Sequence, residues 1–203
     1  MCLLFLQKQK LFAELWLCIS LTGLFFSLVT HPTAVFAQVQ TGYIDDQFGD
    51  PRTLLSPVYS TNGNPDWVQN ANCTGGCWDL DIQQVFNQTW HGTEFFVGDV
   101  ERTMKFQFTG TSLNVYCILP NPVISSDNNL TMDEPIISNY NLRFTLDGQS
   151  QPEFVHTSDG SGQFQYNFSV LSLSDLSNSQ HAFEMAAPTD TNSTILFDYA
   201  TYE

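Results

Sequence analysis

The sequence predicts an all-β fold, an antiparallel β-sandwich that follows an N-terminal signal segment. After residue 100, apolar and polar residues alternate with the period of two that marks half-buried strands. Short clusters of Asn, Gly, Pro and Ser separate these segments, as turns do in all-β proteins. Helical signals are limited to a turn or two at 79–86 and 173–177. Because such turns are too short to cover a sheet, we expect two sheets to cover each other.

Residues 1–37 have the three parts of a secretory signal peptide. Two lysines precede an apolar run at 15–29, and Ala34-Val-Phe-Ala37 places small or slim residues before a cleavage site. We expect cleavage after Ala37, a secreted product, and a single β-sandwich domain over 38–203 that does not insert into a membrane. The alternative is an uncleaved signal anchor, which the short run disfavours because a membrane span needs about 20 residues.

The strands of the domain are predicted from the alternation. Residues 43–100 alternate poorly and are rich in Gly, Pro, Asn and Trp, which predicts an edge strand followed by long loops at one end of the sandwich. Strands are expected around 104–108, 113–117, 142–146, 154–156, 164–170, 182–186 and 193–202. Thr109-Gly110 predicts a hairpin between the first two of these, and Asp147-Gly148 predicts a tight turn after the third. The polar stretch 121–135 is predicted to be a mobile loop.

Composition excludes two broad classes of protein. The chain of 203 residues is 42% hydrophobic and 14% aromatic, too apolar for a disordered protein. Its formal net charge is −15, with only 6 Lys and Arg. A nucleic-acid partner is therefore not expected, because a binder needs basic residues to displace counterions from phosphates.

The cysteines suit an oxidising compartment. Cys73-Thr-Gly-Gly-Cys77 is a short, flexible loop in which we expect a structural disulfide. A zinc site is not supported, because no second pair or suitably spaced His accompanies it. Cys117 falls on the apolar side of a predicted strand, and we expect it to be buried and unpaired.

Five Asn-x-Ser/Thr sequons follow the signal segment and become usable glycosylation sites if the chain is secreted. They are Asn72, Asn87, Asn129, Asn167 and Asn192.

A set of short motifs carries a resemblance to a known group of proteins. The motifs are Tyr43-Ile-Asp-Asp, Phe48-Gly-Asp, Cys73 with Cys77, Phe86-Asn, Thr89-Trp-His91, Phe106-Gln-Phe-Thr-Gly110, Phe144-Thr-Leu-Asp-Gly148, Gln180-His-Ala-Phe and Leu196-Phe-Asp-Tyr199. Their order resembles that in uncharacterised secreted or membrane-anchored proteins of mushroom-forming fungi (basidiomycetes). The resemblance covers about 42–202 and implies a galactose-binding-like jelly roll, the fold of many carbohydrate-binding modules. It specifies no reaction.

Three tryptophans in the loop-rich region are the candidate ligand-binding residues. Trp67, Trp78 and Trp90 lie near polar side chains, and a sugar site needs an aromatic plane beside groups that bond hydroxyls. The accompanying polar candidates are Asp66, Asp79 and His91. The alternative is that the rings plug the open end of the sandwich. Trp90 is the strongest candidate for such a core position, because Phe86 precedes it by four residues.

Catalytic motifs are absent from the sequence, so we expect no enzyme and no cofactor. The chain has no Gly-x-Ser-x-Gly elbow, metalloprotease motif, phosphate loop or dinucleotide fingerprint. Asp45 and Asp46 are adjacent, so a strand would direct them to opposite faces. If the first and last strands are neighbours, as the resemblance implies, Asp46 and Asp198 are weak candidates for a structural calcium site. The alternative is that Asp198 only accepts hydrogen bonds.

Together these features favour a secreted, glycosylated module that binds extracellular or cell-wall carbohydrate without catalysis. The first alternative is a structural or adhesive surface protein. A second alternative is the truncated outer part of a membrane receptor-like protein, because many members of the fungal group continue into a transmembrane helix. A jelly-roll glycosidase or lyase is the remaining alternative, and it would need two carboxylates facing each other across a groove.

Overall fold

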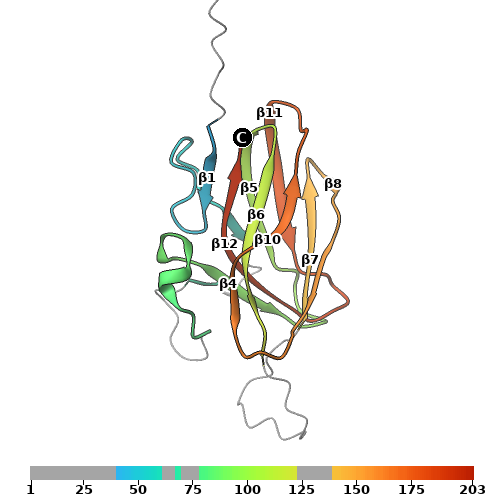
Figure 1. Ribbon diagram of the computed structural model, residues 1–203. Coiled ribbons are helices and arrows are strands. Elements are labelled where there is room, and N and C mark those ends of the chain that lie inside the picture. Colours follow the sequence, from blue (N-terminus) through green and yellow to red (C-terminus); the bar gives the residue numbers. More distant parts are fainter. Residues whose placement is uncertain (1–39, 61–66, 70–77, 123–138) are drawn as a thin grey trace, which may run out of the picture. The chain divides into compact units, whose positions relative to one another are not determined.

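Two antiparallel sheets make up the fold seen in the computed structural model, which describes residues 40–60, 67–69, 78–122 and 139–203 (Figure 1). The first sheet contains β1 (Gly42–Asp45), β3 (Val68–Gln69), β4 (His91–Phe95), β6 (Leu113–Pro120), β10 (Phe164–Leu173) and β12 (Ser193–Tyr202). The second contains β2 (Val58–Ser60), β5 (Thr103–Gly110), β7 (Asn139–Leu146), β8 (Gln149–Ser150), β9 (Phe154–Thr157) and β11 (Ser179–Ala186). Two 3-10 turns, η2 (Ile82–Gln84) and η3 (Phe86–Gln88), precede β4.

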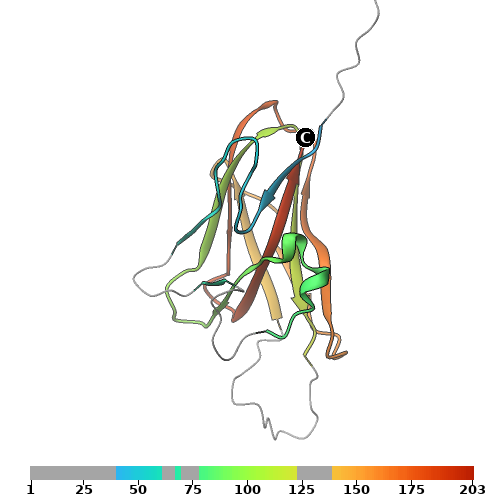
Figure 2. The same ribbon diagram turned by 90° about the vertical axis from the view of Figure 1, so that its left-hand side faces the viewer.

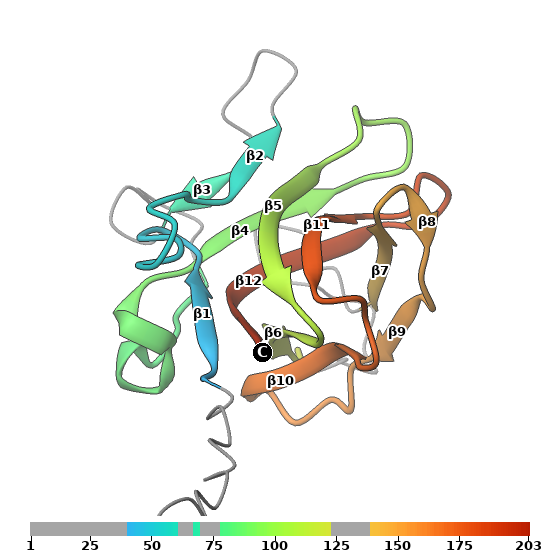
Figure 3. The same cartoon turned by 90° about the horizontal axis from the view of Figure 1, so that it is seen from above.

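The strand order confirms the predicted antiparallel sandwich. The first sheet runs β10-β6-β12-β4-β3 with β1 also paired to β12, and the second runs β2-β5-β11-β7-β8 with β9 paired to β7. From β4 to β12 the long strands alternate between the two sheets, which is how a jelly roll is connected. Figure 3 looks along the strands and shows the two layers. These residues belong to one compact unit.

The main core lies between the two sheets and follows from the alternation. In β5, Met104, Phe106 and Phe108 are buried while the residues between them are exposed. They meet Phe183 of β11 and Phe197 of β12 among the buried residues. Burying one large apolar side chain contributes about 1.5–3 kcal/mol, so this ring-rich layer supplies much of the driving force for folding.

A second, smaller core covers the outer face of the first sheet. Val85 and Trp90 pack there on Ile118 of β6 and Leu196 of β12. Figure 2 shows the η2 and η3 turns (green) beside these strands. Residues on both faces of β12 are therefore buried along most of its length. Strands covered on both faces are uniformly apolar, and Ile195 to Phe197 has that pattern.

The predicted hairpin between 104–108 and 113–117 is wrong. β5 pairs with β11 and β2, whereas β6 pairs with β10 and β12 in the other sheet. The connection is held by the last residue, because Thr111 and Ser112 both donate backbone N–H groups to the carbonyl oxygen of Glu203. Alternation alone does not distinguish the two arrangements, since both strands direct their apolar sides into the same core.

The remaining predicted strands are confirmed, but β4 and the short strands β2, β3 and β8 were not predicted. The Asp147-Gly148 turn joins β7 to β8, and both residues have the positive φ angles (52° and 75°) that such a turn requires. The segment 91–95, predicted to be loop, is instead β4 and pairs with the centre of the first sheet. Its His-Gly-Thr-Glu-Phe sequence has a weak strand signal, because Gly92 replaces a side chain. A Cβ at Gly92 would lie within 2.8 Å of Leu196, Trp78 and Trp90.

Several sequence predictions fall outside the described residues. They are the signal segment 1–37, the Cys73–Cys77 bridge, the sequons at Asn72 and Asn129, Asp66, and the stretch 123–135 of the polar loop. Within the described ranges, no helix has the length and apolar character needed to span a bilayer.

Candidate functional site

A buried acidic cluster, made of Asp45, Asp46 and Asp198, lies where the first strand meets the last. β1 and β12 are antiparallel neighbours, with Asp45 opposite Tyr199. Just beyond the strand, the Asp46 N–H donates to the Asp198 carbonyl oxygen at 3.2 Å. The adjacency of first and last strands that the resemblance implied is therefore confirmed. All three side chains are almost fully buried.

Asp45 shapes the turn that follows β1. Its Oδ1 accepts the N–H groups of Gln47 at 2.9 Å and Phe48 at 2.7 Å, so the chain bends back immediately after the strand. Gly49 closes the bend through reciprocal backbone bonds with Asp45 and has a φ of 70°, which glycine adopts without strain. The other oxygen, Oδ2, accepts the Asn87 amide N–H at 2.8 Å.

Asp46 is held by a hydroxyl and a histidine. Thr89 donates its hydroxyl hydrogen to Asp46 Oδ1 at 2.6 Å, and Asp46 Oδ2 lies 2.7 Å from His91 Nδ1. The Thr89 hydroxyl is also 3.4 Å from Asp45 Oδ1. The expectation that Asp45 and Asp46 face opposite sides is therefore wrong at this point. The strand ends at Asp45, and the turn lets both carboxylates approach one hydroxyl.

Tyr59 covers the histidine of this pair. Its ring stacks on His91 with the centroids 4.1 Å apart, and its hydroxyl donates to the Asp46 carbonyl oxygen at 2.7 Å. Burial and the nearby carboxylates raise the pKa of Tyr59 well above its usual value. The hydroxyl therefore remains a donor at every physiological pH.

Asp198 has an unsatisfied carboxylate oxygen. Oδ1 accepts the Phe86 N–H at 3.0 Å, while Oδ2 is buried without a hydrogen-bond partner among the described residues. Burial, with Asp46 and Asp45 nearby, raises the pKa of Asp198 to about 7. Burial also raises the pKa of Asp46, although its bonds to His91 and Thr89 oppose that shift. The cluster thus stores electrostatic strain at neutral pH.

Cys117 lies next to this cluster. The thiol is buried and free, as predicted, and burial raises its pKa, with the Asp198 charge adding to the effect. A thiol with a raised pKa is a poor nucleophile, so Cys117 acts as a small apolar core residue.

The geometry of the proposed calcium pair is that of a hydrogen-bonded cluster. Asp46 and Asp198 do lie close together, but both Asp46 oxygens are engaged by Thr89 and His91. No group of three or more His, Cys, Asp or Glu residues placed to hold a metal occurs in the described part of the chain. The Phe86 bond to Asp198 agrees with the alternative that Asp198 accepts hydrogen bonds.

Beside the acidic cluster is a cavity of about 550 Å³, which we call the aromatic hollow. It is lined by Tyr43, Asp45, Phe48, Gly49, Pro51, Phe86 and Asn87. Tyr43 is 44% exposed and Phe48 is 62% exposed, so both rings are accessible from solvent. The turn built by Asp45 places Phe48 on one side of the hollow, and η3 places Phe86 and Asn87 on another.

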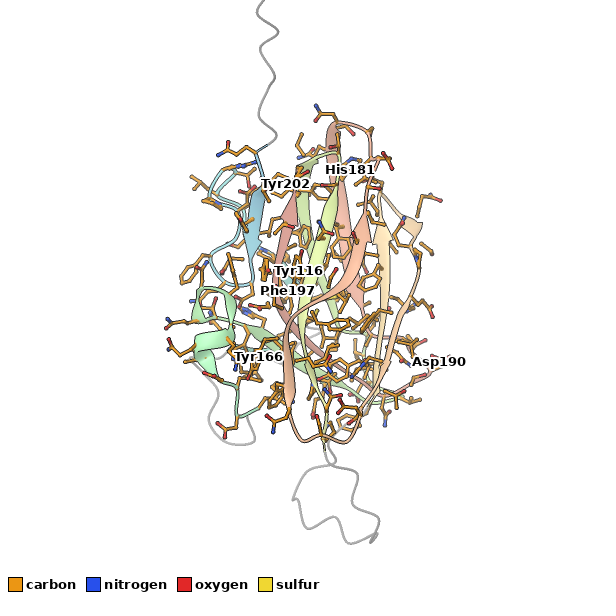
Figure 4. All side chains as sticks on the ribbon, viewed as in Figure 1. Tyr116, Tyr166, His181, Asp190, Phe197 and Tyr202 are labelled. Carbon is orange, nitrogen blue, oxygen red and sulfur yellow. The ribbon has the colours of Figure 1, made fainter. Side chains whose placement is uncertain are left out.

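Phe86 also belongs to a row of stacked rings on the outer face of the first sheet. Its ring lies between Tyr43, at 5.7 Å, and Tyr199, at 4.3 Å, and Tyr199 stacks in turn on Tyr116 at 4.5 Å. Figure 4 labels Tyr116 on this side of the sandwich. Because the inner rings cover one another's faces, free ring faces are left mainly at the ends of the row, and the Tyr43 end borders the hollow.

The structure does not gather the tryptophan candidates into one site. Trp67 is 8% exposed and packs against Tyr59 at 4.9 Å, while Trp90 is 3% exposed and lies in the smaller core. The half-buried Trp78 meets Trp90 edge-on at 5.4 Å. These positions match the alternative in which the rings plug the sandwich.

The polar candidates have separate surroundings. Asp79 is exposed near the smaller core. Two residues further on, the Asp81 N–H donates to the hydroxyl of Tyr166, which Figure 4 labels, at 2.7 Å. His91 belongs instead to the acidic cluster. None of the residues that line the hollow was among the ligand-binding candidates named from the sequence. The signal that could have identified them is the Asp45-x-x-x-Gly49 turn directly after a strand.

The asparagines of the three sequons that the structure describes are all exposed, but their side-chain amides make different hydrogen bonds. Asn87 donates its amide hydrogen to Asp45, and the hydroxyl of its sequon residue Thr89 is buried. Asn167 and Asn192 use their carbonyl oxygens instead, accepting from the Tyr199 hydroxyl and the Val97 N–H. The amide nitrogen that carries a glycan is thus engaged at Asn87 only, among these three.

Comparisons with solved structures find proteins that align with this chain in fold, at low sequence identity. No protein-family model and no curated protein matches the sequence. A family 35 carbohydrate-binding module from Clostridium thermocellum aligns with a TM-score of 0.43 and 8% identity, over 80% of this chain and 97% of that one. TmCBM61, solved with β-1,4-galactotriose, aligns with a TM-score of 0.39 and 5% identity, over 72% and 88%.

Parts of larger proteins also align with this chain. The catalytic unit of a GH87 α-1,3-glucanase from Streptomyces thermodiastaticus aligns with a TM-score of 0.41 and 10% identity. The match covers 82% of this chain but only 26% of the glucanase chain.

Proposed function

We propose that this chain is a secreted, glycosylated binding module for extracellular or cell-wall carbohydrate, with a sugar residue seated in the aromatic hollow. The observation that carries the proposal is the lining of the hollow, where accessible rings of Tyr43 and Phe48 meet the polar side chains of Asn87 and Asp45. A volume of about 550 Å³ is within the usual range for ligand sites.

The lining supplies both kinds of contact that a sugar requires. The C–H face of a pyranose can pack on Tyr43 or Phe48, removing apolar surface from water. The Asn87 amide nitrogen is held by Asp45, which orients the amide and leaves its oxygen to accept a sugar hydroxyl. Both polar groups are fixed before a ligand arrives, which lowers the entropic cost of binding.

Binding without chemical change is part of the proposal. The Asp–His pair that belongs to the acidic cluster beside the hollow is Asp46 with His91, and His91 is stacked under Tyr59. In the described part of the chain, no hydroxyl or thiol bonds to the second ring nitrogen of His91. Asp45 is committed to the turn and to Asn87, so it lacks the freedom of a general acid.

A panel of neutral oligosaccharides tests the proposal, with affinities measured by calorimetry. We expect Tyr43→Ala and Phe48→Ala each to weaken binding by about three- to tenfold, the usual worth of one aromatic contact. Both side chains are exposed, so the thermal unfolding midpoint should hardly change. Val155→Ala is the matched control, because Val155 is exposed on β9, away from the hollow. No binding to any saccharide, or binding by both ring variants as tight as that of the unaltered chain, would overturn the proposal.

A second candidate function is adhesion to another protein. The segment after the hollow exposes Leu54 (84%), Leu55 and Val58 to solvent. Apolar side chains clustered on one loop are typical of contact surfaces. Under this alternative, Leu54→Ser with Leu55→Ser should abolish a partner interaction and leave saccharide binding intact.

A further inference from the structure

The composition of the aromatic hollow restricts the class of saccharide, given the proposed function. Its walls include three rings, Tyr43, Phe48 and Phe86, and its one ionisable acid is Asp45. None of the residues that line the hollow is a Lys, Arg or His. Aromatic faces combined with a carboxylate are the groups that recognise an organic ammonium ion.

The charges around the hollow are negative. Asp46 lies directly behind Asp45 in the buried acidic cluster, and the whole chain carries −15. Asp198 adds its charge only above its raised pKa of about 7. Arg52, the residue that follows Pro51 of the lining, is engaged elsewhere. It donates to the backbone carbonyl oxygens of Gln40 and Thr41 and lies over the Tyr202 ring. The field in the hollow therefore attracts cations and repels anions.

Asp45 retains capacity for a further donor. Its Oδ1 is occupied by the two N–H groups of the turn, whereas Oδ2 accepts a hydrogen bond from Asn87. Each carboxylate oxygen has two lone pairs, so Oδ2 can accept one more hydrogen. A bond from an ammonium group to a carboxylate is about twice as strong as one between neutral groups.

From these observations we infer that the hollow selects saccharides that carry a free amine, of the 2-amino-2-deoxy class, over neutral ones, and rejects uronic acids. The ammonium group contacts the Tyr43 and Phe48 faces and donates to Asp45 Oδ2. Acetylation of the amine removes the charge and two of its three donor hydrogens. A uronate carboxylate would face Asp45 with no cation on the hollow's lining to receive it.

The test is calorimetry of the full chain with three ligands at about pH 6, where an ordinary amine holds its proton. The ligands are a glucosamine tetramer, the N-acetylglucosamine tetramer and a galacturonic acid oligomer. We expect the glucosamine tetramer to bind about tenfold more tightly than its acetylated form, and the uronic acid not to bind. The preference should decrease as salt is raised, because the Tyr43 and Phe48 side of the hollow is open to solvent and salt screens the negative field there.

One variant separates the site from general charge attraction. Phe48→Leu keeps the net charge and the apolar volume but removes a ring face, so it should lose the preference for the amine while still binding neutral sugar. Asp79→Asn is the control, since it removes a surface acid outside the hollow. If Phe48→Leu retains the preference, or Asp79→Asn loses it, the amine binds through overall charge and the inference is wrong.

The two proposals fail in different ways. Equal affinity for the amine and its acetylated form overturns the inference and leaves carbohydrate binding in place. Tighter binding of the uronic acid also overturns the inference alone. No binding of any of the three ligands, together with none in the neutral panel, overturns both.

Discussion

Phe86 donates its backbone N–H to Asp198 Oδ1 at 3.0 Å, so a wall of the aromatic hollow is bonded to the central strand β12. The ring of the same residue stacks on Tyr199, the next residue of that strand. Phe86 is thus fixed twice to β12, and the hollow keeps its form only while the acidic cluster does. The charge state of that cluster should therefore be measurable in the stability of the fold.

Asp198→Asn is expected to stabilise the protein at alkaline pH. The pKa of Asp198 is raised from 3.8 to about 7. Above pH 7 the carboxylate is therefore ionised in both states, but its charge is buried in the folded state and solvated in the unfolded state, which destabilises the fold. Asn keeps an acceptor for Phe86 and places a donor near Asp46 in place of the orphaned oxygen. We expect a gain of about 2 kcal/mol in the free energy of unfolding at pH 8, by urea denaturation.

The same gain should vanish as pH falls from 7 toward 4, because Asp198 then takes up its proton in the folded state and the penalty disappears. Asp190→Asn, in the exposed turn before β12 (Figure 4), is the control and should have no such pH dependence. A loss of stability in Asp198→Asn at both pH 8 and pH 5 would show that the carboxylate is needed in its charged form.

The Thr89 hydroxyl is predicted to be essential to the cluster. Thr89→Val removes the hydroxyl that donates to the buried Asp46 carboxylate at 2.6 Å, and it should lower the free energy of unfolding by about 1–3 kcal/mol. Thr89→Ser retains the hydroxyl and should cost much less. Protein made without glycans is required, because Thr89→Val also removes the Asn87 sequon. Equal losses in the two variants would show that the hydroxyl contributes no more than the methyl group and would contradict the prediction.

His181 is predicted to titrate above its ordinary pKa of 6.5. Nδ1 lies 2.7 Å from Asp147 Oδ2 and Nε2 lies 2.8 Å from the Ser177 carbonyl oxygen, so both ring nitrogens face acceptors and the imidazolium form is favoured. The Asp147 bond raises the pKa of His181. The stabilisation is complete below pH 6.5 and is lost as pH rises through the folded-state pKa. An NMR titration should show the raised pKa, and Asp147→Asn should lower it; an unchanged value in the variant would contradict the prediction.

The cysteines can be tested by thiol labelling of residues 38–203. Cys117 should resist alkylation in the native state and react once urea unfolds the chain, because it is buried and its pKa is raised. If Cys73 and Cys77 form the expected disulfide, their peptide stays unlabelled in urea and becomes labelled only after reduction. Rapid native labelling of Cys117 would contradict its burial, and labelling of Cys73 and Cys77 without reduction would contradict the bridge.

The sequence was sufficient for the fold class and most strand positions. Period-two patterns placed β7, β10, β11 and β12 because each has one face, or both, in a core. Pairing was harder to predict. The Thr109-Gly110 signal marks a reversal of direction, and only the pairing of β5 and β6 with different neighbours shows that the chain crosses to the other sheet there.

The site was predicted less well than the fold, because accessibility depends on packing. Trp67 and Trp90 have suitable chemistry for sugar binding, but neighbouring strands bury them. Tyr43 and Phe48 became candidates only when the Asp45 turn placed them beside η3. Asp198 looked like a residue of a polar edge, whereas the smaller core in fact covers β12 and buries its carboxylate.

The central claim, that a saccharide occupies the aromatic hollow, is tested most directly by an NMR titration of the labelled protein with glucosamine and N-acetylglucosamine tetramers. The account predicts that the amide signals of Phe48, Gly49, Phe86 and Asn87 shift most, saturably, with either ligand. Shifts confined to Trp78, to the β9 surface or to no residue at all would contradict it.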